Sequence, residues 1–310
     1  MGRWRPLASA TTASSGKASA VRQPLSHRLS ERGIDWSLLL LLPAILVLAG
    51  LFLYPFLYGI SISFQPRSGG PFQNYIDFFT NPYQVSSILR TLTLAVPVAL
   101  FSVAFAAPIA YQARRDFRGR QTITLLMMLP LTFGSILIAQ GMSRAFAPYG
   151  WINLALKGLG LPQGNFLYNY WGTFIAAVLT TVPFSFLMMM GFFGGIDRSL
   201  ENAAASLGAS RSARFWQIIF PLALPGVLTA LMLALVEAFA IFPSAILVGQ
   251  PDNQTHVLTI PIYQAAAQQS DYTAASSIAI VLTIIELIVL GVMTSIRSLL
   301  YRGPAVGGKG

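Results

Sequence analysis

Six long apolar runs constrain this chain more than any other feature. A segment of about 20 mainly apolar residues is long enough to cross the hydrocarbon core of a bilayer. Only 10% of the residues are charged and 55% are hydrophobic, whereas soluble domains carry about 25% charged residues. We therefore predict an all-α, polytopic membrane protein. Its six predicted transmembrane helices are residues 36–63, 91–113, 121–141, 170–193, 222–249 and 274–297.

The basic residues predict how these helices are oriented. Of the 20 Lys and Arg residues, 16 precede the first span or follow the second, fourth and sixth spans. Cytoplasmic segments of membrane proteins are enriched in Lys and Arg, so both termini are predicted to be cytoplasmic. The net charge of +10 thus predicts contact with membrane lipid. Nucleic acid is not predicted as a partner, because the sequence lacks a basic face interleaved with base-stacking aromatic residues.

The predicted transmembrane domain is residues 34–300, with short segments on either side. Residues 1–33 are rich in Ser, Ala and Arg and lack the apolar region of a secretory signal. We interpret them as a disordered basic cytoplasmic arm, although the composition loosely fits an organelle transit peptide. Residues 301–310 are predicted to be a flexible tail. Its GPAVGGKG sequence lacks the Ser or Thr, the strand and the helix of a phosphate-binding loop, so any ATPase must be another chain.

No motif of an enzyme is present. The chain has no cysteine, and neither His27 nor His256 has a neighbour at metal-ligand spacing. The G-x-S-x-G turn of serine hydrolases is also missing from the sequence. We therefore predict no catalytic residue, no metal and no cofactor.

Two acidic residues fall within the predicted spans. Glu237 is placed about midway along the fifth span, near Phe239, and Glu286 lies in the sixth. A charged side chain at the bilayer centre costs about 2.5–3.5 kcal/mol on insertion scales, so such residues are functional candidates by default. One interpretation is a cation-binding or polar lining of a translocation path. The other is a protonated carboxyl, or one that is hydrogen-bonded to a neighbouring helix.

A polar segment, residues 197–221, separates the fourth and fifth spans on the predicted cytoplasmic side. Asp197 is a good N-cap type, and the helix predicted over residues 200–207 ends at Gly208, the residue best suited to a left-handed C-terminal cap. Ser210 is of the type that begins a second helix. We call residues 197–221 the elbow.

The second predicted helix of the elbow covers residues 211–220, and Pro221 and Pro225 are expected to interrupt it before the fifth span. Two interpretations of the elbow stay open at this point. It could be an amphipathic helix pair that lies on the inner leaflet, or a knob that docks into a groove of a cytoplasmic partner.

The elbow resembles the EAA motif of importer-type ABC transporter permeases, which reads E-A-A, three residues, G, nine residues, I-x-L-P. The positions that fall in register are Ala203, Ala204, Gly208, Ile218 and Pro221. Two positions depart from the motif. Asn202 stands where the motif has Glu, with Glu201 one residue earlier, and Phe220 stands where it has Leu.

The resemblance implies the type I ABC importer permease fold, with the elbow as a pair of coupling helices in a cleft of an ATPase. The implied coupling residues are Glu201, Asn202, Ala203, Ala204, Gly208, Ile218 and Pro221. The implied partners are two ATP-binding subunits, a second permease subunit and a periplasmic or lipid-anchored substrate-binding protein. The implied location is the bacterial cytoplasmic (inner) membrane.

The residues around Gly208 also carry a prediction about the substrate. The A-A-x-x-L-G-A-S pattern that starts at Ala203 resembles permeases for polyamines, ferric iron and other small ions, whereas sugar permeases usually carry an acidic residue before the glycine. We therefore expect a polyamine-like cation, with sugars or glycerol phosphates as the alternative. A self-sufficient secondary carrier and a membrane scaffold are the alternatives from other classes. The possible substrate-path residues are Glu237, Phe239, Glu286 and Asp271.

Overall fold

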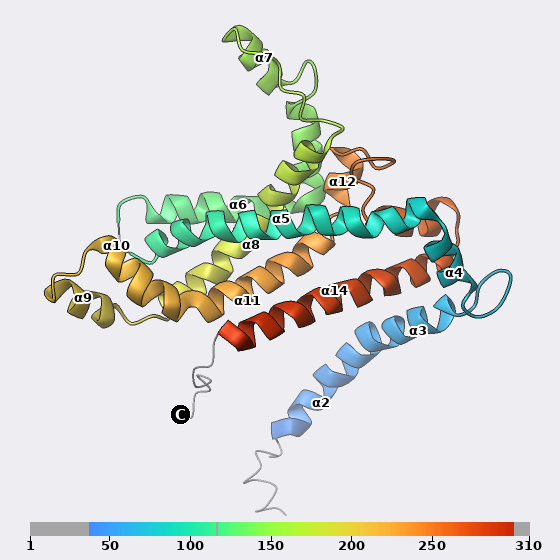
Figure 1. Cartoon of the computed structure of the whole chain (residues 1–310), viewed down its shortest axis with the longest axis horizontal. Helices are drawn as coiled ribbons and strands as arrows, with labels where there is room; N and C mark the ends of the chain where they lie inside the picture. The colour runs from blue at the N-terminus through green and yellow to red at the C-terminus, as the bar shows by residue number, and fades with distance from the viewer. Residues whose placement is uncertain (1–36, 116, 301–310) are drawn as a thin grey trace, which may run out of the picture. The chain divides into compact units, whose positions relative to one another are not determined.

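A computed structural model describes residues 37–115 and 117–300 of the chain. The predicted arm, residues 1–33, and the predicted tail, residues 301–310, lie outside the described residues. All regular elements among the described residues are helices, so the all-α prediction is confirmed (Figure 1). The helices long and apolar enough to cross a membrane are Leu41–Ser63, Pro82–Ala113, Arg120–Ala145, Tyr170–Gly194, Arg211–Phe239 and Tyr272–Leu299. The six predicted spans are therefore all present.

The chain divides into two units, residues 1–57 and residues 58–310. In the first unit, α2 (Ser37–Leu48) runs into a π-helical turn, Ala49–Leu53, and then into α3 (Tyr54–Ser63), which continues across the boundary after Leu57. The Tyr54 backbone N–H bonds the carbonyl of Ala49, five residues back. This wider turn comes just before Pro55, whose ring would meet a carbonyl of a regular α-helix.

The second unit contains the other five spans and a set of shorter helices. Its elements after α3 are α4 (Gln73–Thr80), α5 (Pro82–Ala113), α6 (Arg120–Ala145), α7 (Trp151–Gly158), α8 (Tyr170–Gly194), α9 (Arg198–Ser206), α10 (Arg211–Arg214), the π-helical turn η2 (Phe215–Ile219), α11 (Phe220–Phe239), α12 (Pro243–Leu247), α13 (Thr259–Tyr263), the π-helical turn η3 (Gln264–Gln268) and α14 (Tyr272–Leu300).

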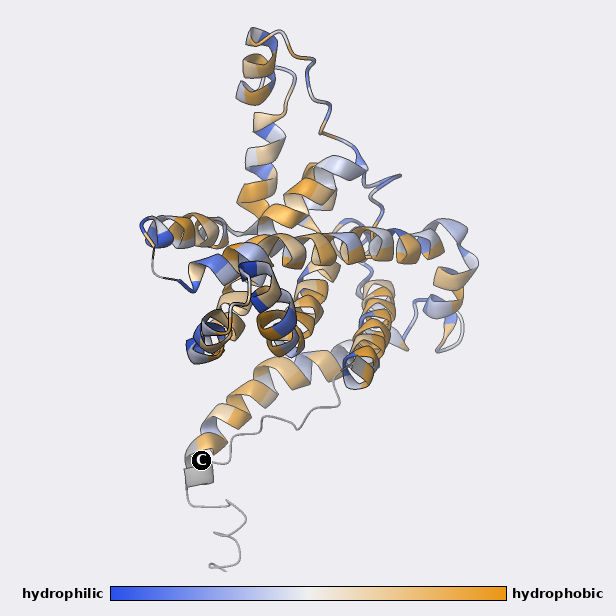
Figure 2. Cartoon of the chain, turned by 60° about the vertical axis from the view of Figure 1, so that its left-hand side comes forward, coloured by the Kyte–Doolittle hydropathy of each residue, from blue (hydrophilic) through white to orange (hydrophobic). Residues whose placement is uncertain are grey.

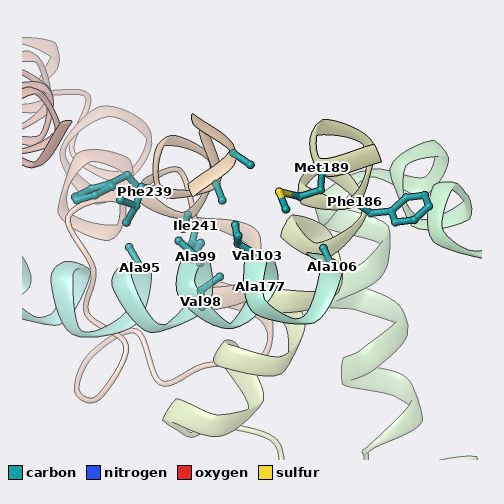
Figure 3. Packing of buried hydrophobic residues seen from close by; sticks show 14 of the residues in the cluster. Ala95, Val98, Ala99, Val103, Ala106, Ala177, Phe186, Met189, Phe239 and Ile241 are labelled. Carbon is teal, nitrogen blue, oxygen red and sulfur yellow. The ribbon is translucent and has the colours of Figure 1, made fainter. Parts of the chain in front are cut away.

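Small residues bring the helices of the core together. α5, α8 and α11 pack against one another, and their buried faces are rich in alanine, as at Ala99 and Ala106 of α5 and Ala177 of α8 (Figure 3). Larger side chains such as Phe186 and Met189 of α8 fill the remaining space. In lipid the hydrophobic effect does little to drive helices together, so close packing of small residues has to stabilise their association.

One glycine is required by the contact between α8 and α11. A Cβ atom at Gly226 of α11 would collide with the side chain of Phe192 of α8. This role of Gly226 was not predicted from the sequence. A glycine in a transmembrane helix indicates that another helix can pack closely there, but it does not identify that helix. Any side chain here would push the two helices apart.

α6, which contains the span predicted over residues 121–141, is bent. Gly134 has φ 68° and ψ 165°, so the helix breaks there and changes direction. This backbone conformation is accessible essentially to glycine alone. The break lies four residues after Pro130, so the non-helical residue is Gly134 and not the proline.

The fifth span differs from its predicted bounds at both ends. It begins at Arg211 and ends at Phe239, whereas residues 222–249 were predicted. Prolines 221 and 225 do not interrupt it. The chain then turns and forms α12, so Glu237 lies in the last turn of the span and not midway along it. A continuous apolar run cannot distinguish one long helix from a helix followed by a buried turn.

The second unit has polar segments at both ends of its apolar helices. Figure 2 shows the hydrophilic residues concentrated in the connecting segments. α9 and α10 lie at the end opposite α4 (Figure 1). The sequence places the elbow end in the cytoplasm, and that orientation stays a prediction.

Overpacking the α5 core should destabilise the fold. We expect Ala99→Leu, at a fully buried site, to lower the free energy of unfolding by about 1–3 kcal/mol, because the neighbouring helices leave no space for the added atoms. The matched control is Leu100→Phe, which enlarges a side chain that is 51% exposed on the same helix. Retention of a monodisperse peak after heating in detergent measures the difference. Equal behaviour of the two variants would contradict the packing argument.

Candidate functional site

The first half of the elbow is a short helix with a cap at each end. The side chain of Asp197 accepts a hydrogen bond of 2.8 Å from the backbone N–H of Ser199, and this bond lowers the pKa of Asp197. At the other end the N–H of Ala209 bonds the carbonyl of Ala204 and the N–H of Gly208 bonds that of Ala205, both at 3.0 Å. This is the Schellman arrangement.

Gly208 has φ +83°, the left-handed conformation that the cap needs. A Cβ atom there would meet nothing within 4 Å. The requirement for glycine is therefore conformational and not steric. The predicted end of the helix at Gly208 is confirmed.

The second half of the elbow is the start of the fifth span. The side chain of Ser210 accepts from the N–H of Ala213 at 3.2 Å, which confirms the predicted N-cap. α10, η2 and α11 then follow one another without a break, and η2 ends at Ile219, two residues before Pro221. The wider π turn accommodates the proline ring, and this is why the predicted interruption does not occur.

The predicted coupling residues separate into exposed and buried positions. Asn202, Ala203 and Gly208 are exposed, as is Pro221, while Ala204 and Ile218 are half-buried. Leu207, which the sequence analysis used only for the substrate, is 89% exposed at the tip. The side chain of Glu201 instead lies buried between α9 and the end of α5. We call the exposed residues Asn202, Ala203, Leu207 and Gly208 the tip.

Glu201 is held by three side chains from the end of α5. Its Oε1 accepts a hydrogen bond from the Tyr111 hydroxyl at 3.1 Å and forms an ion pair with Arg115. Its Oε2 lies 3.5 Å from a terminal nitrogen of Arg114, whose side chain is only 3% exposed. Removing one partner of a buried ion pair typically costs about 3–5 kcal/mol, because the other charge is left uncompensated.

Tyr111 lies at the centre of this group. Its ring packs edge-on against Phe193 at the end of α8 and against Phe215 of η2, with ring centroids 5.6 and 5.0 Å apart. The guanidinium groups of Arg114 and Arg115 lie 5.6 and 5.4 Å from its ring centroid, within the range of cation–π attraction. Tyr111 therefore contacts side chains from three elements besides its own helix.

Arg198 adds a fourth connection. Its guanidinium donates a hydrogen bond to the backbone carbonyl of Arg114. This cluster was not predicted from the sequence, because the arginines after the second span indicate topology by their position and nothing local shows that they pair with Glu201. Glu201, an acidic residue three positions after Arg198 in the predicted cytoplasmic segment, was the available indication of an internal ion pair. We call Tyr111, Arg114, Arg115, Arg198 and Glu201 the elbow cluster.

The possible substrate-path residues occupy different environments. Glu237 is exposed on the surface of this chain, and Glu286 of α14 is half-buried. Phe239 is only 2% exposed and packs in the core, so its side chain offers almost no surface to a solute in this conformation. Among the described residues, no hydrogen bond or ion pair joins any two of the four predicted path residues.

Asp271 lies at the end of the unit opposite the elbow, just before α14. Burial raises its pKa, but hydrogen bonds from the Ala274 N–H and the Thr273 hydroxyl, together with Arg67, lower it by more. Its Oδ2 pairs with Arg67 at 3.3 Å. Arg67 also donates to the carbonyl of Ser270 at 2.7 Å. Asp271 therefore caps α14 and holds the loop before α4.

Arg67 and Asp271 line a polar cavity of about 320 Å³ together with Asp77. Ser68 and four amide side chains add to its polar lining, namely Asn74, Gln84, Gln264 and Gln269. Asp77 accepts a hydrogen bond from Gln73 at 2.7 Å. The cavity joins the loop before α4 to η3 and α14, so it belongs to the segments that the sequence predicts on the outer side.

His256 has the surroundings of a structural residue. It is fully buried, its ring stacks on Tyr83 with centroids 4.0 Å apart, and its Nδ1 donates to the carbonyl of Pro251 at 2.9 Å. Burial is the main cause that lowers its pKa. Within residues 37–115 and 117–300, no group of three His, Cys, Asp or Glu side chains is placed to hold a metal ion.

These features define a multi-pass helical membrane protein with a structured elbow between its fourth and fifth spans. Residues 91–303 match the family model described as "Binding-protein-dependent transport system inner membrane component". This match covers well over half of the chain, and the chain therefore belongs to this family, the permeases of ABC importers. It is a multi-pass protein of the inner membrane, and the resemblance drawn from the EAA motif is confirmed at the level of the family.

Individual proteins agree with the family assignment. The chain is 25% identical to a probable sulfate transport system permease protein of Prototheca wickerhamii, over 72% of this chain and 86% of that protein. It is 28% identical to a putative ferric transport system permease protein of Haemophilus influenzae, over 69% of this chain and 34% of that protein. The fold matches a chain in the crystal structure of a bacterial ABC transporter involved in the import of alginate, with a TM-score of 0.76, 21% identity and coverage of 90% and 100%.

Membership in the family settles the question of enzymatic activity. The ATPase of these importers is a separate subunit, and the permease is not itself an enzyme. The relatives do not support the predicted closeness to polyamine-type permeases, since their names refer to sulfate and ferric transport.

Proposed function

We propose that this chain forms half of the translocation path of an ATP-driven importer and that the tip of its elbow docks into an ATP-hydrolysing subunit. The continuous helix from Arg211 to Phe239 carries this proposal. A displacement of the elbow passes along that helix directly into the α5–α8–α11 core. A loop broken at Pro221 would absorb the displacement instead.

The surface of the tip favours docking to a protein. Leu207 is 89% exposed beside small side chains, which suits a shallow groove that takes one apolar anchor. The alternative, an elbow lying on the inner leaflet, would also bury Leu207. The caps at Asp197 and Gly208 favour docking, because a lipid surface requires no fixed turn between the two helices.

The proposed assembly contains two ATP-binding subunits, a second permease subunit and a periplasmic or lipid-anchored binding protein. Family membership supports this composition, and one structural relative was solved in complex with a periplasmic protein that carries an alginate pentasaccharide. Both termini and the elbow are then cytoplasmic. A self-sufficient secondary carrier is the alternative, but it would not require a rigid elbow, because it has no ATPase subunit to bind.

For the substrate we propose a small charged solute, with a polyamine-like cation as the specific prediction. The support is Glu237, an exposed carboxylate in the last turn of α11. The carbonyl groups at a helix C-terminus add negative potential there, which favours a cation. Asp271 contributes less attraction for a cationic substrate than its charge suggests, because Arg67 already pairs with it. Sugars or glycerol phosphates remain the alternative.

The conformation at Gly208 provides a test of docking. We expect Gly208→Val to weaken co-purification of the ATPase subunits by roughly tenfold, because a β-branched residue at positive φ costs about 1–3 kcal/mol. Gly208→Asn is the matched control, since Asn tolerates this conformation. Pull-down from detergent and binding-protein-stimulated ATP hydrolysis are the measurements. Normal assembly and hydrolysis with Gly208→Val would rule out the rigid tip as the docking element.

The substrate class is tested at Glu237. Glu237→Gln should slow uptake of radiolabelled spermidine into proteoliposomes that contain the whole importer, because the carboxylate's attraction for the cation is removed. Asp271→Asn is the comparison and should have a smaller effect, since that carboxylate is already paired. Unchanged spermidine uptake in the Glu237 variant, or no spermidine uptake by the unaltered importer, would contradict the prediction.

A further inference from the structure

Glu201 is one of two acidic residues of the elbow, with the N-cap Asp197, and its side chain points away from the tip. Its neighbour Asn202, which occupies the motif's acidic position, is exposed, whereas Glu201 is 7% exposed. The partners of Glu201 lie 86 to 90 residues earlier in the chain, at the end of α5. In this conformation the carboxylate has almost no surface with which to contact another subunit.

Within the elbow cluster, Glu201 is the acidic residue that pairs with Arg114 and Arg115. Arg114, Arg115 and Arg198 supply three positive charges, and Glu201 supplies the carboxylate among them. The terminal nitrogens of Arg114 are buried and make no hydrogen bond within the part of the chain that the structure describes. The Arg114 guanidinium forms an ion pair with the Glu201 Oε2, at 3.5 Å. Without Glu201 the buried guanidinium of Arg114 would lose this carboxylate.

The elbow cluster also connects α9 to α5, two helices that do not follow each other along the chain. α9 is joined covalently to the end of α8 on one side and through Ser210 to the fifth span on the other. Its backbone packs against α10 and η2, and it reaches α5 through the side chains of the cluster. α5 is the longest helix of the unit and packs against α8 and α11 within the core.

We propose that Glu201 is a positioning residue for coupling: it fastens α9 to the end of α5, so that a docked elbow moves α5 together with the fifth span. The inference rests on the proposed docking of the elbow to an ATPase. It assigns Glu201 a role inside the permease, in place of the contact with the ATPase that the motif resemblance implies. Arg115 and Tyr111 are the side chains through which it acts.

The test uses the complete importer in nanodiscs, with its binding protein as purified together with its bound solute. The variants are Glu201→Gln, Arg115→Gln and the double variant. Each should retain the ATPase subunits and basal ATP hydrolysis, because the tip is unchanged. The ratio of stimulated to basal hydrolysis should fall about tenfold in Glu201→Gln, because an uncompensated buried charge releases α9 from α5.

Comparison of the single and double variants shows whether Glu201 and Arg115 act through one shared interaction or independently. If Glu201 acts through Arg115, the double variant should be no worse than Glu201→Gln, since residues that work as one unit give effects that do not add. Arg115→Lys retains the charge and should keep most of the stimulation. Additive losses, or loss of stimulation in Glu201→Gln with none in Arg115→Gln, would overturn the assigned role.

A reversible tether distinguishes positioning from folding. The chain contains no cysteine, so Glu201→Cys with Arg115→Cys introduces the only two thiols of the permease. Stimulation should be lost in the reduced pair and regained when a short bis-methanethiosulfonate reagent joins the two thiols. It should be lost again on reduction, in a complex whose other subunits have no accessible cysteine. Failure of the tether to restore stimulation would overturn the proposal.

A control at the tip keeps this inference separate from the proposed function. Leu207→Ala alters the exposed surface alone and should reduce association with the ATPase subunits. If Leu207→Ala and Gly208→Val both assemble and hydrolyse ATP normally, the docking proposal fails. If the tip variants lose the ATPase while Glu201→Gln is stimulated normally, docking stands and only the role of Glu201 is overturned.

Discussion

The close approach of α5, α8 and α11 is the constraint on which the rest of the second unit depends. In lipid, helices gain little from burying apolar surface against each other, so contact area and small side chains must hold them together. Alanines on the facing surfaces and Gly226 opposite Phe192 provide that approach. The ends of the same helices then fix where every polar segment can lie, including the elbow at one end and the Arg67–Asp271 pair at the other.

The elbow shows how a polar segment can be rigid beside a membrane core. Its two helices are closed by caps at Asp197, Gly208 and Ser210, so most of its backbone groups are satisfied locally. The second helix continues into the fifth span, and the elbow cluster fastens the first helix to α5. The elbow is thus attached to the core by covalent continuity on one side and by electrostatics on the other.

Local signals predicted much of this structure. Apolar length identified the spans, and the left-handed glycine and the serine cap were read correctly because both depend on neighbouring residues alone. The errors concern features that depend on residues far away in the sequence or on packing between helices. Proline indicated an interruption at Pro221, but a π turn accommodates it. Glu201 was assigned to coupling with the ATPase by the motif resemblance, and its pairing inside the permease was missed because its partners are 86 to 90 positions away. The turn after Phe239 was missed, since a buried turn is as apolar as a helix.

The Schellman cap at Gly208 has a thermodynamic consequence for any protein that binds the tip. A flexible loop loses conformational entropy when it is ordered at an interface, and this loss is subtracted from the affinity. In the elbow that ordering is already complete before an encounter, because the cap holds α9 and the following turn in one conformation. A small interface centred on Leu207 can therefore be tight enough to transmit motion, and a partner can bind and release it without folding or unfolding it.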